Sequence, residues 1–165
     1  MKTITILAIV LFVFYSCQTS TTKQVKQDST SENRTDSTLI RSTGADEYGM
    51  RQYILVLLKE DKARRPDSAE MARIESGHLK YLKHLMDDRK ILVLGPILED
   101  NPIAGICIYD CKTVDEAKKL AASDPAVQSG ELVVEAHPWY GTAALMKIPE
   151  IHQKIAVKSF GEIAK

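Results

Sequence analysis

The chain has 165 residues with 22 basic and 22 acidic side chains, so its formal net charge at pH 7 is zero. This length fits one domain with a modest core, and the apolar and charged fractions, 44% and 27%, are those of an ordinary globular protein. The basic residues are scattered rather than clustered, which excludes nucleic acid as an expected partner.

The first segment has the pattern of an export signal. An apolar run at residues 4–15 follows a short positive start, and it has the length of a signal-peptide core rather than of a membrane span. Ser16 and Cys17 resemble the lipobox of bacterial lipoproteins, where cleavage before the cysteine leaves it carrying fatty acyl chains such as palmitate. We therefore expect a signal peptide at residues 1–16 and lipidation of Cys17, with an uncleaved N-terminal anchor as the alternative. Either anchor would hold the folded part in the cell envelope, outside the cytoplasm and tethered to a bacterial membrane.

The next segment, residues 17–50, is rich in Ser, Thr, Gln and Asp and contains few apolar side chains. Such a composition cannot bury enough surface to offset its ordering entropy, so we expect a disordered tether. Roughly thirty flexible residues span on the order of 30 Å, enough to hold a small domain clear of a lipid surface.

The rest of the chain predicts alternating strands and helices. Residues 52–58 and 90–94 are β-type runs with two apolar faces, so each strand should be covered on both sides. Two capping patterns, Asp67 with Glu70 and Thr113 with Glu116, mark helix starts. The predicted order is strand 52–58, helix 67–88, strand 90–94, strand 103–109, helix 114–122, a short helical turn capped by Asp124, and strand 131–136.

This βαββαβ order predicts an α+β, ferredoxin-like fold with two helices on one face of an antiparallel sheet. The second face would be too hydrophobic to remain in water, because the first two strands are apolar on both sides. A second copy of the same sheet is the simplest cover, so we expect a homodimer that forms a dimeric α/β barrel. Residues 145–165 are amphipathic and interrupted by Pro149, and we expect them to form a C-terminal helical extension of short pieces that pack on the domain.

Cys107 and Cys111 are the cysteines of the predicted domain. Four residues apart in a strand, they would be separated by roughly 13 Å, beyond the Cα separation that a disulfide tolerates. We expect both thiols to be free and to behave as small apolar residues.

Several short motifs together carry a resemblance to a known family. They are Gly77-His78-Leu79, Leu94-Gly95-Pro96, Ser123-Asp124-Pro125 and the run HPWYG from His137 to Gly141. In this order and spacing they resemble the YCII-related domain family over residues 51–144. The resemblance implies a ferredoxin-like dimeric α/β barrel and an active site formed by a histidine and an aspartate, here His78 and Asp124. One departure is Arg89, where relatives usually carry glycine between the helix and the second strand.

His78 lies on the apolar stripe of helix 67–88, so its side chain should point inward. Taken alone, the residues fit a core histidine and a helix-capping role for Asp124. Taken with the resemblance, a carboxylate at Nδ1 would fix the imidazole tautomer and prepare the ring for proton abstraction. Such a mechanism needs no metal and no cofactor. His84 faces away from His78 on the same helix and should be a solvated surface residue.

Further candidate ligand-binding residues are Gly95, Pro96, His137, Trp139 and Tyr140. Gly95 and Pro96 have a sufficient role in chain geometry, and Gly95 would allow close backbone approach near His78. The aromatic residues follow the last predicted strand as a turn, which either walls a pocket or packs only against the second helix.

Two functions from different classes remain open. One is a cofactor-free enzyme of the lyase or isomerase kind that uses His78 on a small cyclic or aromatic molecule, by analogy with the family's relatives in aromatic-compound degradation. The other is a non-catalytic module of the cell envelope that binds a small ligand or another protein. The cavity beside His78 discriminates between them, according to whether it is closed by apolar side chains or open and lined by several polar groups.

Overall fold

The structure, a computed structural model, describes residues 35–61, 63, 66–158 and 160–162. The predicted signal peptide, Cys17 and residues 17–34 of the predicted tether lie outside these residues. In the described part of the tether, the helix α1 (Ser37–Thr43) replaces the predicted disorder. The physical reason is local capping: Asp36 accepts hydrogen bonds from two backbone N–H groups at the start, and Gly44 ends the helix in the left-handed conformation.

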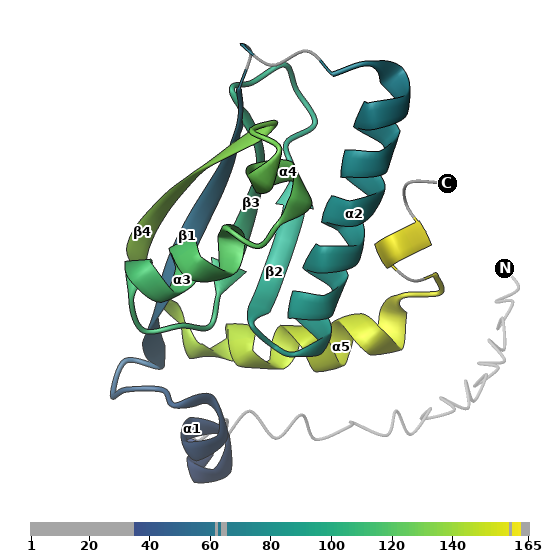
Figure 1. The fold of residues 1–165 in the computed structure, drawn as a ribbon. Helices are drawn as coiled ribbons and strands as arrows, with labels where there is room; N and C mark the ends of the chain where they lie inside the picture. Colours follow the sequence, from purple (N-terminus) through teal and green to yellow (C-terminus); the bar gives the residue numbers. More distant parts are fainter. Residues whose placement is uncertain (1–34, 62, 64–65, 159, 163–165) are drawn as a thin grey trace, which may run out of the picture. The chain divides into compact units, whose positions relative to one another are not determined.

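Four antiparallel strands form one sheet in the order β2-β3-β1-β4. The predicted βαββαβ order is confirmed, and the fold is α+β and ferredoxin-like (Figure 1). The elements are β1 (Met50–Glu60), α2 (Ser68–Asp87), β2 (Ile91–Pro96), β3 (Ile103–Tyr109), α3 (Val114–Ala121), α4 (Pro125–Gln128) and β4 (Leu132–Thr142). Among the described residues, none of the helices has the length and apolar character that crossing a membrane requires.

The two main helices begin where their capping patterns predict. The side chain of Asp67 accepts a hydrogen bond from the N–H of Glu70 at 2.8 Å, and α2 starts at the next residue after this cap. Thr113 caps α3 in the same way, accepting from the N–H of Glu116 at 3.2 Å. Each cap satisfies a backbone donor that the helix itself cannot pair, which fixes where the helix begins.

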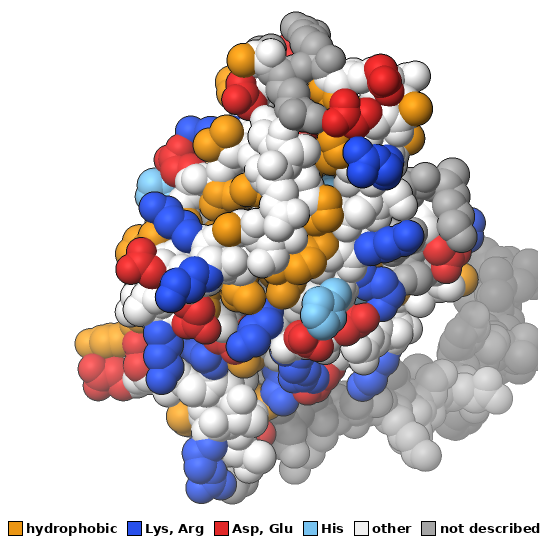
Figure 2. All heavy atoms as spheres, viewed as in Figure 1, with side chains coloured by type: hydrophobic (Ala, Val, Ile, Leu, Met, Phe, Trp, Pro, Cys, Tyr) orange, Lys and Arg blue, Asp and Glu red, His pale blue; other side chains and the backbone are white. Residues whose placement is uncertain are grey.

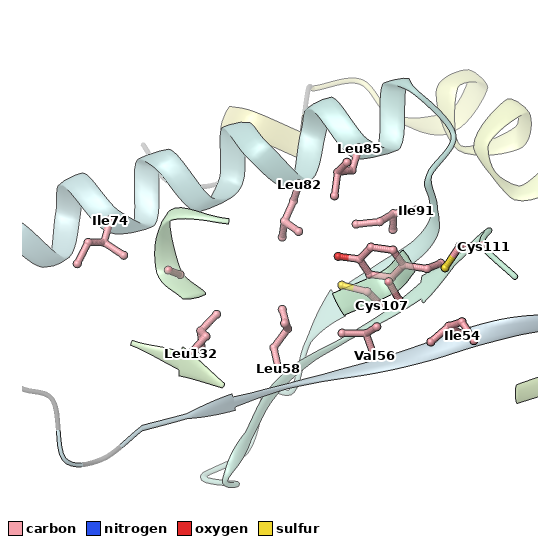
Figure 3. Close-up of a cluster of buried hydrophobic side chains, with 13 residues drawn as sticks. Ile54, Val56, Leu58, Ile74, Leu82, Leu85, Ile91, Cys107, Cys111 and Leu132 are labelled. Atoms are coloured by element: carbon pink, nitrogen blue, oxygen red, sulfur yellow. The ribbon is translucent and has the colours of Figure 1, made fainter. Parts of the chain in front are cut away.

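The helices α2, α3 and α4 cover one face of the sheet. Their inward side chains meet alternate residues of the strands in one cluster, and the close-up shows the side chains of α2 pointing toward those of β1, β2 and β3 (Figure 3). The fully buried members include Ile54, Val56, Ile91, Cys107, Tyr109 and Ala117. This face therefore contains the main hydrophobic core. Cys107 and Cys111 are both free and buried, as predicted.

The opposite face carries a smaller cluster, formed by Tyr53, Leu92 and Ile108. Leu145 and Met146 of the 3-10 helix η1 (Ala143–Lys147) pack against it. The chain continues through α5 (Ile148–Ile155), which runs past the ends of β2 and α2, to η2 (Phe160–Glu162) (Figure 1). The expected helical pieces are present, and they cover part of the face that the sequence assigns to a second copy.

The predicted aromatic turn after the fourth strand is wrong. Residues 137–141 belong to β4, and they pair with β1 in a continuous register that sets Trp139 opposite Tyr53 and Pro138 opposite Ile54. Proline and glycine in this run are typical of a turn. Because β4 lies at the edge of the sheet, however, Pro138 can occupy it without removing a hydrogen bond from a central strand.

Candidate functional site

The candidate site lies where α2 meets α4. A Cβ atom at Gly77 would lie 3.1 and 3.2 Å from two ring carbons of Pro125, the first residue of α4. Any side chain at this position would press the two helices apart, so glycine is used here despite a cost of about 1 kcal/mol in a helix interior. The close approach brings Asp124, the N-cap of α4, beside His78, which follows Gly77.

His78 and Asp124 are joined directly. The Nδ1 atom of His78 lies 2.7 and 2.9 Å from the two carboxylate oxygens of Asp124. The side chain of Asp124 is 3% exposed and that of His78 is 16% exposed. Because an ionised carboxylate only accepts hydrogen bonds, the Nδ1 atom of His78 is the donor in this contact, and Nε2 lies on the other side of the ring. The predicted meeting of the two residues is confirmed, and their catalytic use stays a prediction.

The Asp124 carboxylate has a second partner. Its Oδ1 atom accepts a hydrogen bond from the backbone N–H of Ala126 at 2.9 Å, which caps α4. The capping role and the contact with His78, which the sequence leaves as alternatives, are therefore combined in one side chain. Since the helix terminus also holds the carboxylate, its orientation toward His78 does not depend on a ligand.

The side chains near Asp124 are neutral at physiological pH. Burial, and after it the charge of Asp124, raises the pKa of Cys107 to about 12. Burial likewise raises the pKa of Tyr109 and that of Tyr81, whose hydroxyl donates a hydrogen bond to the carbonyl of Leu120 at 2.7 Å. These groups remain protonated, so they add no negative charge beside the Asp124 carboxylate.

His78 lines a pocket of about 260 Å³ between α2 and the sheet. Most of the wall is apolar, and its charged or basic side chains are those of Glu75 and His78. Asp124 does not line the pocket, so it can act on a ligand only through the imidazole of His78. In the view of Figure 1, hydrophobic side chains reach the surface in a strip beside α2 (Figure 2). The remaining lining residues are Leu58, Leu79, Leu82, Leu94, Gly95, Pro96, Ala104, Gly105, Ile106, Cys107, Leu132 and Phe160.

The structure divides the other predicted ligand-binding residues into two groups. Gly95 and Pro96, at the end of β2, line the pocket with His78. His137 and Trp139 lie on the opposite face of the sheet, because they alternate along β4 with the inward side chains of Leu132, Val134 and Ala136. His137 Nε2 lies 2.7 Å from the Glu135 carboxylate, and the Trp139 ring centroid lies 5.9 Å from that of Tyr53.

Tyr140 is also outside the pocket. It is 53% exposed at the far end of β4, and its hydroxyl donates a hydrogen bond to the Asp46 carboxylate. Of the two alternatives for the aromatic group, a wall of the His78 pocket is therefore not formed by His137, Trp139 or Tyr140, and ligand binding by these residues stays a prediction. The physical cause is the extension of β4, which converts an expected turn into an alternating strand that leads away from His78.

Two lining residues were missed by sequence analysis. Glu75 is an exposed residue one helical turn before His78, and its spacing of three residues could have placed it on the same side of α2. Phe160 lies in the C-terminal extension, where no pattern indicates that the chain returns to α2.

In residues 35–61, 63, 66–158 and 160–162, no group of three or more His, Cys, Asp or Glu side chains is arranged to hold a metal ion. His84 lies toward solvent on α2, with a 64% exposed side chain and its Nε2 atom 3.6 Å from Asp88, as predicted for a surface residue.

Comparison with known proteins supports the resemblance carried by the motifs. The YCII-related domain matches residues 50–140. Comparison with curated proteins gives no match. Among solved structures, the chain is similar to 5-chloro-2-hydroxyhydroquinone dehydrochlorinase from Burkholderia phenoliruptrix in complex with 2,5-dihydroxybenzoquinone, with 24% identity, a TM-score of 0.41, and coverage of 53% of this chain and 92% of that chain. Since the family match spans more than half of the 165 residues, the chain belongs to the YCII-related domain family.

Proposed function

We propose that this chain is an enzyme of the lyase or isomerase kind that acts on a small organic molecule, with His78 as its general base or acid. The observation that carries the proposal is the hydrogen bond between His78 Nδ1 and the buried Asp124 carboxylate at the wall of an apolar pocket. A pocket with few polar groups, one of them an oriented imidazole, suits proton transfer to or from a mostly apolar ligand.

The proposed chemistry needs only these two side chains. Nε2 of His78 accepts a proton from the bound molecule, and the resulting imidazolium is stabilised by the Asp124 carboxylate on the other side of the ring. The same nitrogen then returns the proton to another atom of the molecule or to a leaving group. Asp124 is a positioning residue in this scheme, since it does not line the pocket. The scheme uses no cofactor.

The location of the enzyme is part of the proposal. We infer that Cys17 is acylated and that the domain is tethered to a bacterial membrane and lies outside the cytoplasm, because Ser16 and Cys17 follow an apolar run of signal-peptide length. Cys17→Ser should leave the chain unprocessed or release it from membranes. Intact-mass analysis of the membrane-bound protein would contradict the inference if residues 1–16 were still attached and no lipid were present.

A second candidate function is a non-catalytic module that binds a small ligand. The mostly apolar pocket wall favours it, because such a wall supplies binding energy without any chemical step. The two functions share the pocket and differ in what His78 does. Binding by a module should tolerate the loss of the Asp124 contact, whereas proton transfer should not.

A ligand screen followed by turnover tests these alternatives. Cyclic and aromatic small molecules are screened by thermal shift, and each hit is incubated with the protein and analysed for chemical change. For an enzyme, His78→Ala should lower turnover roughly 10²- to 10⁴-fold, and Asp124→Asn should lower it while asparagine still caps α4. The matched control is His84→Ala, on the solvent side of the same helix. Bound ligands that remain chemically unchanged would favour the binding module.

A further inference from the structure

Phe160 forms a wall of the His78 pocket from outside the family domain. The family match ends at residue 140, whereas Phe160 belongs to η2 in the C-terminal extension. Its side chain is partly buried and packs against the core cluster between α2 and the sheet. The matched domain therefore supplies the floor of the pocket and the side of α2, and the extension supplies an additional wall.

The extension that carries Phe160 is held by packed contacts at its base. Leu145 and Met146 pack on the opposite face of the sheet, and Pro149 is buried at the start of α5. Glu150 joins this helix to the turn after α2, since its Oε1 atom lies 3.1 Å from Arg89 Nη2. The path from one face of the sheet to the other is thus fixed before the chain reaches Phe160.

A second hollow lies on another side of the same residue. It has a volume of about 230 Å³ and lies between the end of α2 and α5, with Met86 and His152 among its lining residues. Phe160 lines this hollow as well as the His78 pocket. A smaller side chain at this position would extend the His78 pocket toward the second hollow, and a larger one would shorten it.

We propose that Phe160 determines the size of the ligand that the His78 pocket accepts. This inference rests on the proposed function, because it takes the His78 pocket as the ligand site. The flat ring of Phe160 offers an apolar contact to an uncharged ligand, and the Glu75 carboxylate in the same lining disfavours an anionic one. An apolar wall also disfavours burial of a charged group, so the ligand class is largely apolar and not anionic, with its upper size limit set by residue 160.

The test measures how well two uncharged probes that differ by one ring protect His78. The full-length membrane-bound protein is treated with diethyl pyrocarbonate, and modification of His78 is followed by peptide mass spectrometry with the exposed His84 as internal reference. Benzyl alcohol and 2-naphthylmethanol are the probes. The quantity measured is the ratio of their half-protecting concentrations in the unchanged protein, Phe160→Ala and Phe160→Trp. The matched control is Ile155→Ala, a 70% exposed residue of α5 that lines neither hollow.

Phe160→Ala should shift the ratio about tenfold in favour of the larger probe, and Phe160→Trp should shift it in the opposite direction. Ile155→Ala should leave it within twofold. An unchanged ratio in both Phe160 variants, or no protection of His78 by either probe, would overturn the inference. If Phe160→Ala destabilises η2, Phe160→Trp still tests the inference. If the ratio shifts but His78→Ala keeps full turnover, the proposed catalysis is wrong and the role of Phe160 stands. If His78→Ala loses turnover but the ratio does not shift, only the role proposed for Phe160 is wrong.

Discussion

On the face of the sheet covered by α2, α3 and α4, strand side chains such as Ile54, Val56 and Cys107 are at most 1% exposed. The opposite face is covered over part of its area by the C-terminal extension, and beyond that cover Val133 is 50% exposed and Trp139 is 36% exposed. The candidate site lies entirely on the first face. The dense packing there fixes the positions of the Asp124 and His78 side chains relative to each other, which a partly open face could not do.

The uncovered part of the opposite face mixes apolar and charged groups. Glu135 accepts from Lys59 and lies 2.7 Å from His137 Nε2, and Lys59, followed by His137, holds the pKa of this carboxyl below its usual range. Leu55 and Leu57 of β1 lie partly exposed on the same side. An apolar area with paired charges is suited to a protein partner, and the predicted homodimer would cover it. We therefore propose that the face covered by α2, α3 and α4 carries the chemistry and that the opposite face mediates assembly.

The largest expected effect follows from placing a charge on the opposite face. We propose that the chain forms a homodimer through this face. A single chain should tolerate Val133→Arg, because position 133 is exposed there, but in the dimer the arginine would be an unpaired charge in the interface. Such a charge should weaken association by about 3 to 5 kcal/mol. Light scattering at micromolar concentration should give a dimer for the unchanged protein and a monomer for the variant, with the far-UV circular dichroism unchanged.

The matched control is Ile155→Arg, which adds the same charge at a 70% exposed position of α5. It should remain a dimer. If the unchanged protein is itself a well-folded monomer, the extension is the complete cover of the opposite face and the homodimer prediction is wrong.

The second prediction compares the two faces by equal truncations. Leu85 of α2 is 3% exposed in the main core and does not line the His78 pocket, so Leu85→Ala should lower the free energy of unfolding by about 2 to 5 kcal/mol. Leu57→Ala, on the opposite face, should cost less than about 1.5 kcal/mol in the monomer, because Leu57 keeps part of its exposure in the folded chain. Urea unfolding of both variants measures the difference. Equal losses would mean that the two faces are packed alike.

The strands and helices of the domain could be predicted because their signals are local. Alternating apolar residues and the capping side chains of Asp67 and Thr113 specify each element within a few positions, and β3 has its predicted bounds. The errors occur where local signals conflict with pairing. Pro138 and Gly141 are typical of a turn, yet β1 is long enough to pair with them as strand. The α1 helix was missed because composition outweighed the capping signal of Asp36.

The site could be predicted only in part. The contact between His78 and Asp124 is accessible to reasoning because topology places both helices on one face and the motifs carry the family resemblance. The pocket depends on how segments distant in the sequence pack together, and no local pattern at Glu75 or Phe160 predicts that packing. The sequence leaves open whether the aromatic residues of β4 wall a pocket, because no local signal indicates that strand alternation continues beyond residue 136.

The third prediction tests the contact that positions Asp124. Gly77→Val places a branched side chain against Pro125 and should cost about 1 to 3 kcal/mol of unfolding free energy, because α4 must move away from α2. The movement should lengthen the hydrogen bond to His78. Nitrogen NMR of the imidazole should report the Nδ1–H tautomer in the unchanged protein and a mixture of tautomers in the variant.

The control for this variant is Ala72→Val, which introduces the same side chain at an exposed position of α2. It should lower helix propensity by a few tenths of a kcal/mol, whereas valine at position 77 is a better helix former than the glycine it replaces, and it should not change the tautomer of His78. An unchanged imidazole spectrum in Gly77→Val would mean that the two helices need not approach closely for Asp124 to reach His78.

The smallest expected effect concerns Arg89, which connects the end of α2 with the extension. Arg89 has a φ of 57°, its N–H donates to Met86 at 2.9 Å, and the N–H of Lys90 donates to Leu85 at 2.8 Å. This is the helix ending that favours glycine, in agreement with the glycine that the family resemblance leads us to expect here. Arg89→Gly removes the left-handed strain and also the exposed ion pair with Glu150, worth about 0 to 1 kcal/mol.

Arg89→Ala is the matched variant, because it removes the same ion pair but keeps a Cβ in the left-handed conformation. The glycine variant should be more stable than the alanine variant by about 1 kcal/mol in urea unfolding, and its own change from the unchanged protein should be close to zero or slightly stabilising. If alanine and glycine are equally stable, the left-handed position is not strained. Arg89 would then contribute through its ion pair with Glu150. Arginine in place of the glycine expected from the family would serve to fix the C-terminal extension, which contacts both faces of the sheet.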